Sequence, residues 1–239
     1  MKLATAATLA ALLASAEATP SLADGRRVVL DPGHGGTNAG ARGYGVSEKQ
    51  LTLALADQVR DRLAERGLRV DLTRTKDETL TLRQRVAFAN RARADLFVSI
   101  HANASPNRTQ RGFETFLLTP HGIDVDGRAL RSDTITPRPD VDPEIALVLD
   151  DVERGSSQWE AADLAARMQR SLQKRRGAKG DRGVRQDAHH VLLGATMPAV
   201  LVEVGFIDHP IEGRELLDPA VQAQLADAIA EAIVDQLAE

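Results

Sequence analysis

The 239-residue sequence predicts a single α/β domain over residues 24–239, built on a largely parallel sheet with helices on both faces. Segments typical of strands alternate with segments typical of helices, which is the order found in βαβ units. The strand segments are almost continuously hydrophobic, as expected for a sheet that is covered on both faces. A hydrophobic content of 43% supplies enough apolar side chains for a sizeable core.

Six segments have the composition of buried strands. They are short, rich in Val, Ile, Leu and Phe, and bounded by Gly, Pro or charged residues. In chain order they cover residues 27–31, 68–74, 95–101, 112–118, 190–193 and 199–206.

Four segments between and after these strands have apolar residues at helical spacing. They cover residues 47–67, 81–93, 158–175 and 218–239. The first of them starts at Ser47, a typical N-cap residue, and closes at Gly67, a typical helix terminator. Residues 119–157 do not fit this alternation, because they are rich in Pro and Asp around one short apolar piece. A segment of this length predicts a functional or mobile insertion, such as a lid, a blocking helix or a surface loop.

The first 23 residues predict a signal peptide and therefore a periplasmic or secreted protein. Lys2 is followed by an uncharged run rich in Ala and Leu, and small residues suited to cleavage lie at 14–16 and 21–23. A surface helix or a frayed terminus is the alternative interpretation. No segment approaches the roughly 18 apolar residues of a membrane helix, so we expect no membrane span in the mature chain.

Charge and cysteine content narrow the class of function. The net charge of -4 offers no basic excess for a nucleic-acid surface, so we expect no nucleic-acid partner. The chain has no cysteine. Any metal must therefore be held by His, Asp or Glu.

Four polar side chains follow or end predicted strands, or begin the helix beside them. His34 lies in a glycine-rich loop after the first strand, His101 ends the third, and Glu203 lies in the last, while Glu48 opens the first long helix. Ligand sites of open α/β sheets lie beyond the carboxyl ends of the strands. A glycine-rich loop can also cradle phosphate, but that function needs backbone N–H groups and no imidazole. Two histidines and a carboxylate match the ligand set of catalytic zinc sites.

Glu203 interrupts the apolar run "PAVLVEVGFI". A half-buried carboxylate is costly unless a metal, a cation or a proton accompanies it. A position on the solvent face of the strand is the alternative. Glu114 in "GFETFLL" poses the same question, as a supporting or a structural acid. Of the other histidines, His121 and His209 fall in loops next to proline, whereas His189 and His190 precede a predicted strand and could reach the edge of the site.

Five separated motifs resemble the zinc-dependent N-acetylmuramoyl-L-alanine amidases, the type that includes periplasmic cell-division amidases and some phage endolysins. The motifs span nearly all of residues 27–210, apart from the insertion, and occur in the order found in that family. They are "VVLDPGHGGTNAGA", "SEKQLTLALADQV", "VDLTRTKDETLTLRQRVAFANRARADLFVSIHANAS", "GFETFLL" and "MPAVLVEVGFIDHP".

The resemblance implies a mixed six-stranded sheet and a Zn²⁺ ion bound by His34, Glu48 and His101, with Glu203 as the catalytic carboxylate. It also implies cleavage of the amide between N-acetylmuramic acid and L-alanine in peptidoglycan. A zinc peptidase or another amidohydrolase with the same ligands is the alternative, and a non-catalytic binding protein is a third interpretation.

The resemblance bears on partners and supporting residues as well. In cell-division members an insertion near this place carries a helix that blocks the zinc site until a partner displaces it, so an activator protein is a possible partner. The proline-rich insertion of this chain does not align with such a helix. Arg74 and Asn103 lie in matched segments, either as supports of the site or as contacts to the substrate.

Overall fold

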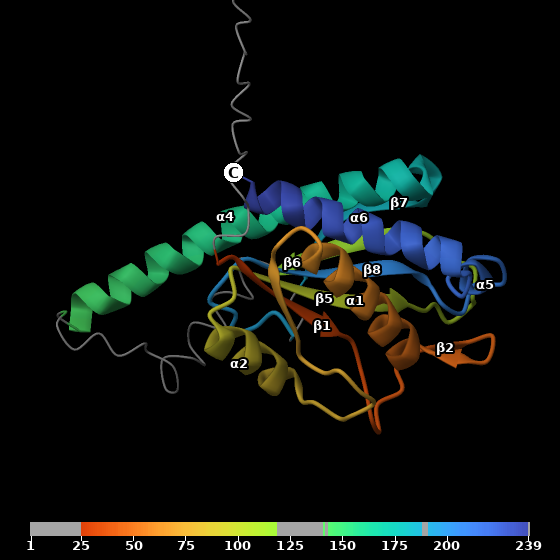
Figure 1. The fold of residues 1–239 in the computed structure, drawn as a ribbon, viewed down its shortest axis with the longest axis horizontal. Helices are drawn as coiled ribbons and strands as arrows, with labels where there is room; N and C mark the ends of the chain where they lie inside the picture. The colour runs from red at the N-terminus through yellow and green to blue at the C-terminus, as the bar shows by residue number, and fades with distance from the viewer. Residues whose placement is uncertain (1–24, 119–140, 142, 188–190, 239) are drawn as a thin grey trace, which may run out of the picture.

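The structure is a computed structural model that describes residues 25–118, 141, 143–187 and 191–238. These residues form one α/β domain (Figure 1). The predicted signal peptide, residues 1–23, lies outside the described residues, and so does most of the predicted insertion.

The chain alternates strands and helices, as predicted. The strands are β1 (Arg27–Pro32), β2 (Arg42–Gly43), β3 (Val46–Ser47), β4 (Arg69–Leu72), β5 (Leu96–Asn103), β6 (Phe113–Leu118), β7 (Asp181–Asp187) and β8 (Ala199–Phe206). The helices are α1 (Glu48–Ala64), α2 (Leu82–Ala92), α4 (Pro143–Arg176), α5 (Glu212–Glu215) and α6 (Pro219–Leu237), with a 3₁₀ turn at Ala178–Gly180.

The main sheet has six strands in the order β4-β1-β5-β8-β6-β7. Neighbouring strands are parallel except for β6 and β8, which are antiparallel. The sheet is therefore mixed, which confirms the predicted fold class. The short strands β2 and β3 form a separate antiparallel hairpin just before α1.

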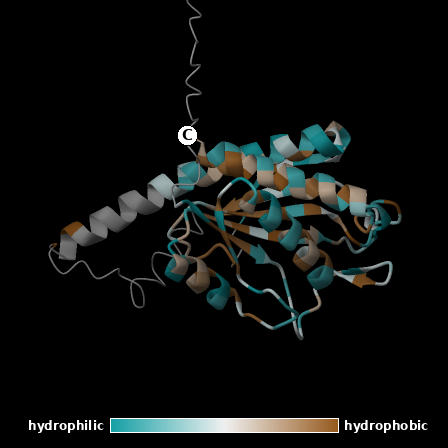
Figure 2. Cartoon of the chain, in the orientation of Figure 1, coloured by the Kyte–Doolittle hydropathy of each residue, from teal (hydrophilic) through white to brown (hydrophobic). Residues whose placement is uncertain are grey.

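Two apolar cores lie on the two faces of the sheet. Alternate residues of β1, β5 and β8, such as Val28, Val98 and Val200, pack with α1, α4 and α6 in the larger core. The opposite residues of these strands, such as Phe97 and Leu201, pack with α2 and the segment after β7. Figure 2 shows the central strands largely in the hydrophobic colour. Because α2 is short, it covers only part of its face.

Capping residues define the starts of three helices, and the one at Ser47 was predicted from the sequence. Gln50 of α1 accepts a hydrogen bond from the backbone N–H of Ser47 at 3.0 Å, and Gln84 of α2 does the same for Thr81 at 2.8 Å. Asp218 caps α6 by accepting from the backbone N–H of Ala220. The cap at Ser47 places Glu48 in the first turn of α1.

The strand predicted over residues 190–193 is wrong, since residues 191–194 form a turn. Val191 and Leu192 are apolar because they are buried against the core on the α2 face. The sixth strand of the sheet is instead β7, which was not predicted because its sequence "DRGVRQD" is polar and mostly exposed. It pairs only with β6 at the edge of the sheet, where a polar strand is favourable.

Helix α4 begins at Pro143, fifteen residues before the start predicted from the helical pattern. The end of the predicted insertion, residues 143–157, is therefore helical and continuous with the predicted third helix. Trp159 lines a cavity with Arg26 and Leu96, which lie at the starts of β1 and β5. This stretch of α4 passes the edge of the sheet where those strands begin.

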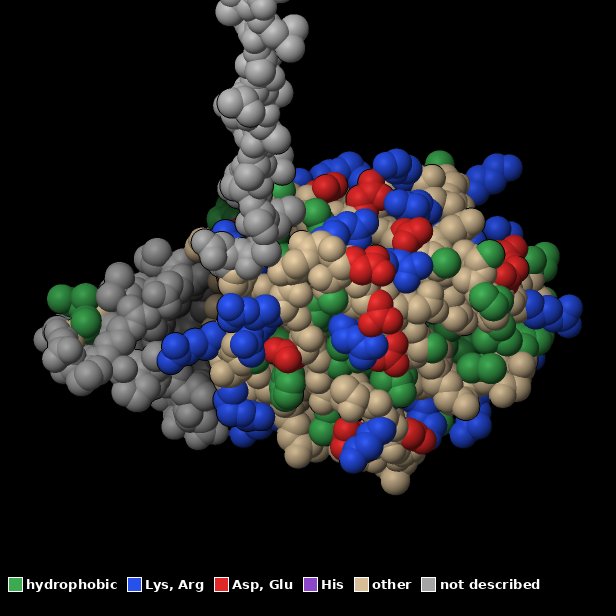
Figure 3. Space-filling model, in the orientation of Figure 1, with side chains coloured by type: hydrophobic (Ala, Val, Ile, Leu, Met, Phe, Trp, Pro, Cys, Tyr) green, Lys and Arg blue, Asp and Glu red, His purple; other side chains and the backbone are tan. Residues whose placement is uncertain are grey.

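Surface charge on the face shown in Figure 3 is mixed. Lys and Arg side chains are interspersed with Asp and Glu over α1 and α6, and this face carries no continuous basic stripe. Among the described residues, no helix combines the length and the hydropathy needed to cross a membrane.

Candidate metal centre

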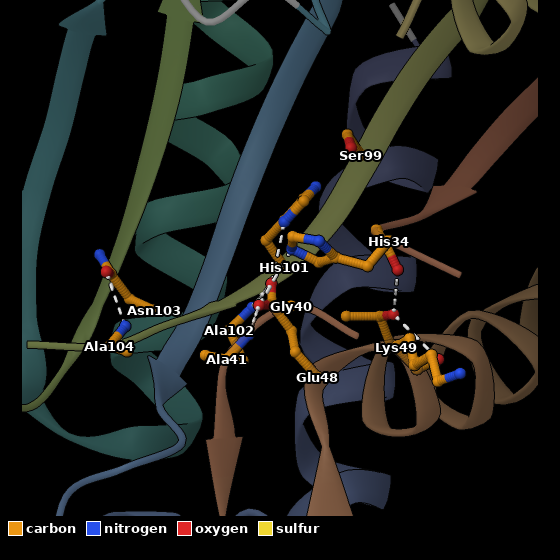
Figure 4. A network of polar contacts seen from close by, with 12 residues as sticks. His34, Gly40, Ala41, Glu48, Lys49, Ser99, His101, Ala102, Asn103 and Ala104 are labelled. Atoms are coloured by element: carbon orange, nitrogen blue, oxygen red, sulfur yellow. Dashed lines mark hydrogen bonds and ion pairs between the residues drawn. The ribbon is translucent and has the colours of Figure 1, made fainter. Parts of the chain in front are cut away.

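His34, Glu48 and His101 come together at the edge of the sheet where β1 and β5 end. His34 follows β1, Glu48 is the first residue of α1, and His101 lies near the end of β5. Their nitrogen and carboxylate atoms lie within 4.8 Å of one another. Figure 4 shows the three side chains converging from these elements. The structure thus brings together the three residues predicted as metal ligands.

Glu48 lies between the two imidazoles. Its Oε2 is 3.0 Å from His34 Nε2, and its Oε1 is 2.9 Å from His101 Nδ1. The backbone N–H groups of Ala41 and Ala102 donate to the same two oxygens at 2.9 and 3.0 Å. Burial acts to raise the pKa of Glu48, but the hydrogen bonds and charges of both histidines lower it well below its usual range. Glu48 is therefore held as a carboxylate, the form that binds a metal.

The backbone of His34 lies in the left-handed region, with φ at 60°. His34 Nδ1 is 3.0 Å from the side-chain oxygen of Asn38, which suits a donor nitrogen there and directs Nε2 toward Glu48. Burial lowers the pKa of His34, but the hydrogen bond and charge of Glu48, helped by Asn38, outweigh it and raise the pKa above 6.5. The local contacts thus orient the ring and strengthen its basicity.

Two buried arginines hold the loop that carries His34. Arg74 donates to the backbone oxygens of Pro32 and Gly33 at 2.9 and 2.8 Å. It also donates to the backbone oxygen of Lys49 in α1 at 2.8 Å. Arg85 donates to the backbone oxygen of His34 at 2.5 Å. Arg74 therefore supports the site from behind and does not face it.

Asp31 is the buried counter-ion of Arg85. It is fully buried in β1 and accepts from Arg85 at 2.6 Å, from the Ser99 hydroxyl at 2.7 Å and from the Thr73 hydroxyl at 2.5 Å. Asp31 and Arg85 were not singled out in the sequence. The position of Asp31 near the end of an apolar strand was the only indication of this pair in the sequence, because its partner Arg85 in α2 is distant along the chain.

Two glycines leave the space that the cluster occupies. A Cβ atom at Gly33 would lie 2.5 Å from the His101 ring, and one at Gly40 would lie 2.5 Å from Glu48 Oε2. Gly40 also has φ at +64°, where glycine is favoured. The glycine-rich loop therefore shapes the cluster by close approach.

Glu203 lies next to the cluster, on the neighbouring strand. In the β5–β8 pairing it is the register partner of His101, on the face of the sheet that α2 covers only in part. Its side chain is half-buried, and its Oε2 atom is shielded from solvent without a hydrogen-bond partner among the described residues. Burial above all, and then the charges of Glu48 and Glu114, raise the pKa of Glu203 well above 4.5. Such a carboxyl is suited to taking up and returning a proton near neutral pH.

Glu114 is the register partner of Glu203 on the other side, in the antiparallel β6–β8 pair. Its Oε1 accepts from the Asn103 side chain at 3.0 Å, and its Oε2 accepts from Arg182 at 3.1 Å. Glu114 is thus a paired, buried acid beside the site, and Asn103 supports it.

Of the remaining histidines the structure describes only His209, which is not part of this cluster. His209 accepts the backbone N–H groups of Ile211 and Glu212 at the start of α5, which is a structural role. His121, His189 and His190 lie outside the described residues.

The cluster fits a zinc ion on chemical grounds. Two imidazoles and one carboxylate are a catalytic zinc ligand set, which leaves a further position for water. The two histidines hold the pKa of Glu48 well below its usual range, and two glycines let the loop approach the ligands closely. The buried Oε2 of Glu203, unpartnered among the described residues, lies on the adjacent strand.

Comparison with known proteins gives a consistent result. Residues 28–235 match the family model described as N-acetylmuramoyl-L-alanine amidase. The chain is 35% identical over 218 residues to the N-acetylmuramoyl-L-alanine amidase AmiA of Escherichia coli, covering 87% of this chain and 75% of AmiA. It is 33% identical over 210 residues to the uncharacterized protein YqiI of Bacillus subtilis, covering 88% and 84% of the two chains.

Solved structures show the same likeness. The N-acetylmuramoyl-L-alanine amidase AmiC2 of Nostoc punctiforme superposes with a TM-score of 0.68 at 29% identity, covering 90% of this chain and 98% of that one. The catalytic domain of CwlV, an N-acetylmuramoyl-L-alanine amidase of Bacillus (Paenibacillus) polymyxa, gives 0.63 at 30% identity, covering 89% and 98%. The residues matched by the family model, 28–235, include every residue of the cluster.

Proposed function

Because the chain belongs to the N-acetylmuramoyl-L-alanine amidase family, we propose that this peptidoglycan amidase works as a zinc hydrolase with His34, Glu48 and His101 as metal ligands and Glu203 as general base. The enzyme cleaves the amide between N-acetylmuramic acid and the L-alanine of the stem peptide. The convergence of the His–Glu–His cluster beside Glu203 is the observation that supports this mechanism.

Zinc, when bound, supplies Lewis acidity, which lowers the pKa of water to about 7 and polarises the scissile carbonyl. Glu203 accepts a proton from the attacking water and returns it to the leaving amine nitrogen. Its raised pKa suits both steps, because the proton must be taken up and released at the same pH. The lowered pKa of Glu48 suits an ionised metal ligand.

The other residues of the site hold these groups in place. Asn38 and Arg85 orient His34 through its Nδ1 atom and its backbone oxygen, and Arg74 ties the loop to α1. Preorganisation of this kind keeps the ligands from reorganising during the reaction.

Purified sacculi provide the direct test. We expect the enzyme to release intact stem peptides that begin with L-alanine, detected by mass spectrometry, and EDTA to stop the reaction until zinc is added back. His34→Ala should lose both zinc and activity, whereas the control His209→Ala should keep bound zinc. Cleavage within the stem peptide would support the alternative zinc peptidase, and full activity after exhaustive metal removal would contradict a zinc mechanism.

We propose in addition that residues 1–23 direct export, so that the enzyme reaches peptidoglycan in the periplasm or outside the cell. The uncharged apolar run after Lys2 supports this. N-terminal sequencing of the mature protein tests it, with cleavage expected after residue 16 or 23. An activator protein stays a prediction from the family resemblance.

A further inference from the structure

A pair of arginines continues the active-site face beyond Glu203. On this face of the sheet, β8 carries Glu203, β6 carries Glu114 opposite to it, and β7 carries Arg185 opposite Phe116 of β6. Both Arg182 and Arg185 contact the same Glu114 Oε2, at 3.1 and 3.4 Å. Two arginine side chains of the edge strand β7 thus lie two strands away from the proposed general base.

The two arginines have different surroundings. Arg182 also donates to the Gln110 side chain at 3.0 Å, and its guanidinium lies 5.0 Å from the centre of the Phe206 ring. Arg185 has its Nε at 3.4 Å from Glu114, and half of its side chain is exposed. One carboxylate cannot neutralise two guanidinium groups. Arg182 is the better-held partner of Glu114, so a positive charge is left on the exposed Arg185.

We propose that Arg185 binds a carboxylate of the stem peptide and thereby contributes to substrate specificity. This inference rests on the proposed function, because it requires the peptide to leave the metal centre across β8 and β6. A guanidinium presents a planar fork of N–H donors that matches a carboxylate, and such charge-assisted pairs are stronger than neutral hydrogen bonds.

The spacing across the sheet suits this role. Adjacent strands lie about 4.7–4.9 Å apart, so β7 lies on the order of 10 Å from β8. An extended peptide advances about 3.3–3.6 Å per residue, which carries the second stem residue about 7 Å from the scissile amide. The long arginine side chain covers the remaining gap. The carboxylate in question is therefore that of the second stem residue.

Two muropeptides that differ at one group test the proposal. Both carry the muramyl–alanine amide, and the carboxylate of the second stem residue is free in one and amidated in the other. We expect the wild-type enzyme to show about tenfold higher kcat/KM for the free acid, as one charge-assisted hydrogen bond would give. Arg185→Gln should abolish this preference through a rise in KM for the free acid.

Two further variants control for charge and folding. Arg66→Gln removes the same charge from an exposed residue after α1 and should keep the full preference. Arg185→Lys retains a charge without the planar fork, so we expect an intermediate preference, and it serves as the test if the glutamine variant does not fold.

The outcomes separate the two levels of the proposal. Equal kcat/KM of the wild-type enzyme for the two substrates would contradict the role of Arg185, and so would a loss in Arg185→Gln that is the same for both. Cleavage at a peptide bond instead of the muramyl amide would contradict the proposed function itself.

Discussion

His101 and Glu203 are direct register partners on the parallel strands β5 and β8, and both side chains lie on the face of the sheet that α2 covers in part. This pairing places a proposed metal ligand beside a carboxyl whose pKa is raised by burial and by neighbouring acids. Parallel pairing at the sheet centre thus places the proposed metal ligand beside the proposed general base without any local sequence motif.

Glu203→Gln should abolish hydrolysis while leaving zinc bound. The amide has nearly the same shape as the carboxyl but cannot accept the proton of water, and general acid–base catalysis contributes about 10²- to 10⁴-fold. We expect kcat on a muropeptide to fall by at least about 10²-fold, with one zinc per chain by metal analysis. Glu65→Gln, an exposed position after α1, is the matched control. Activity within a few-fold of wild type in Glu203→Gln would contradict the assigned role.

Gly40→Ala should weaken zinc binding. The added Cβ would lie 2.5 Å from Glu48 Oε2 and 2.6 Å from the His34 ring, so the ligands must move apart. Gly45→Ala is a matched control, because Gly45 also has a positive φ but its added Cβ would meet nothing within 4 Å. Competition with a zinc chelator should show a loss of about 10- to 100-fold in affinity for Gly40→Ala, as for disturbed supporting residues of metal sites. An equal effect of the two substitutions would mean that backbone strain alone is responsible.

The central strands, and the convergence of His34, Glu48 and His101, could be predicted from the sequence because apolar runs mark the strands and polar residues mark their ends. An apolar run defines β5, and His101 and Glu203 stand out as polar residues within or at the end of such runs. Strand β7 could not be predicted in this way, since an edge strand that contacts one neighbour needs no apolar pattern. Conversely, Val191 and Leu192 are apolar through burial in a turn, which periodicity alone does not distinguish from a strand.

The hydrogen-bond network that supports the site could not be predicted from local sequence patterns either. Asp31 and Arg85 are separated by 54 positions, and only the packing of α2 against β1 brings them to 2.6 Å. The positive φ of His34 likewise depends on this packing, because Arg85 holds its backbone oxygen. Residue types at strand ends indicated which groups could act, whereas their orientation depends on long-range contacts.

Asp31→Asn should destabilise the fold strongly. The substitution leaves the Arg85 guanidinium buried without its counter-ion, and breaking a buried ion pair in this way costs about 3–5 kcal/mol. Urea unfolding of the zinc-free enzyme measures the effect without a contribution from metal binding. Asp61→Asn removes a partner of Arg60 at an exposed position and should cost less than about 1 kcal/mol. Similar losses for the two variants would contradict the role assigned to the buried pair.

Glu231→Gln should remove a pH-dependent link between α4 and α6. Hydrogen bonds from Lys174 and then Arg175 lower the pKa of Glu231 in the folded state below its ordinary 4.5. A lowered folded-state pKa means that the contribution to stability is complete above the unfolded-state pKa and is lost as the pH falls through the folded-state value.

Lys174 is exposed, and Glu231 and Arg175 are partly exposed, so we expect the substitution to cost about 0.2–1 kcal/mol in the free energy of unfolding at pH 7. The difference in unfolding free energy between variant and wild type should disappear below the folded-state pKa of Glu231. At such pH the protonated glutamate of the wild type and the glutamine of the variant are both uncharged. Urea unfolding at a series of pH values from 7 to about 3 measures this, and high salt should reduce the difference at pH 7. A difference between the proteins that grows on acidification would contradict the assigned sign, because it would require Glu231 to stabilise the fold in its protonated form.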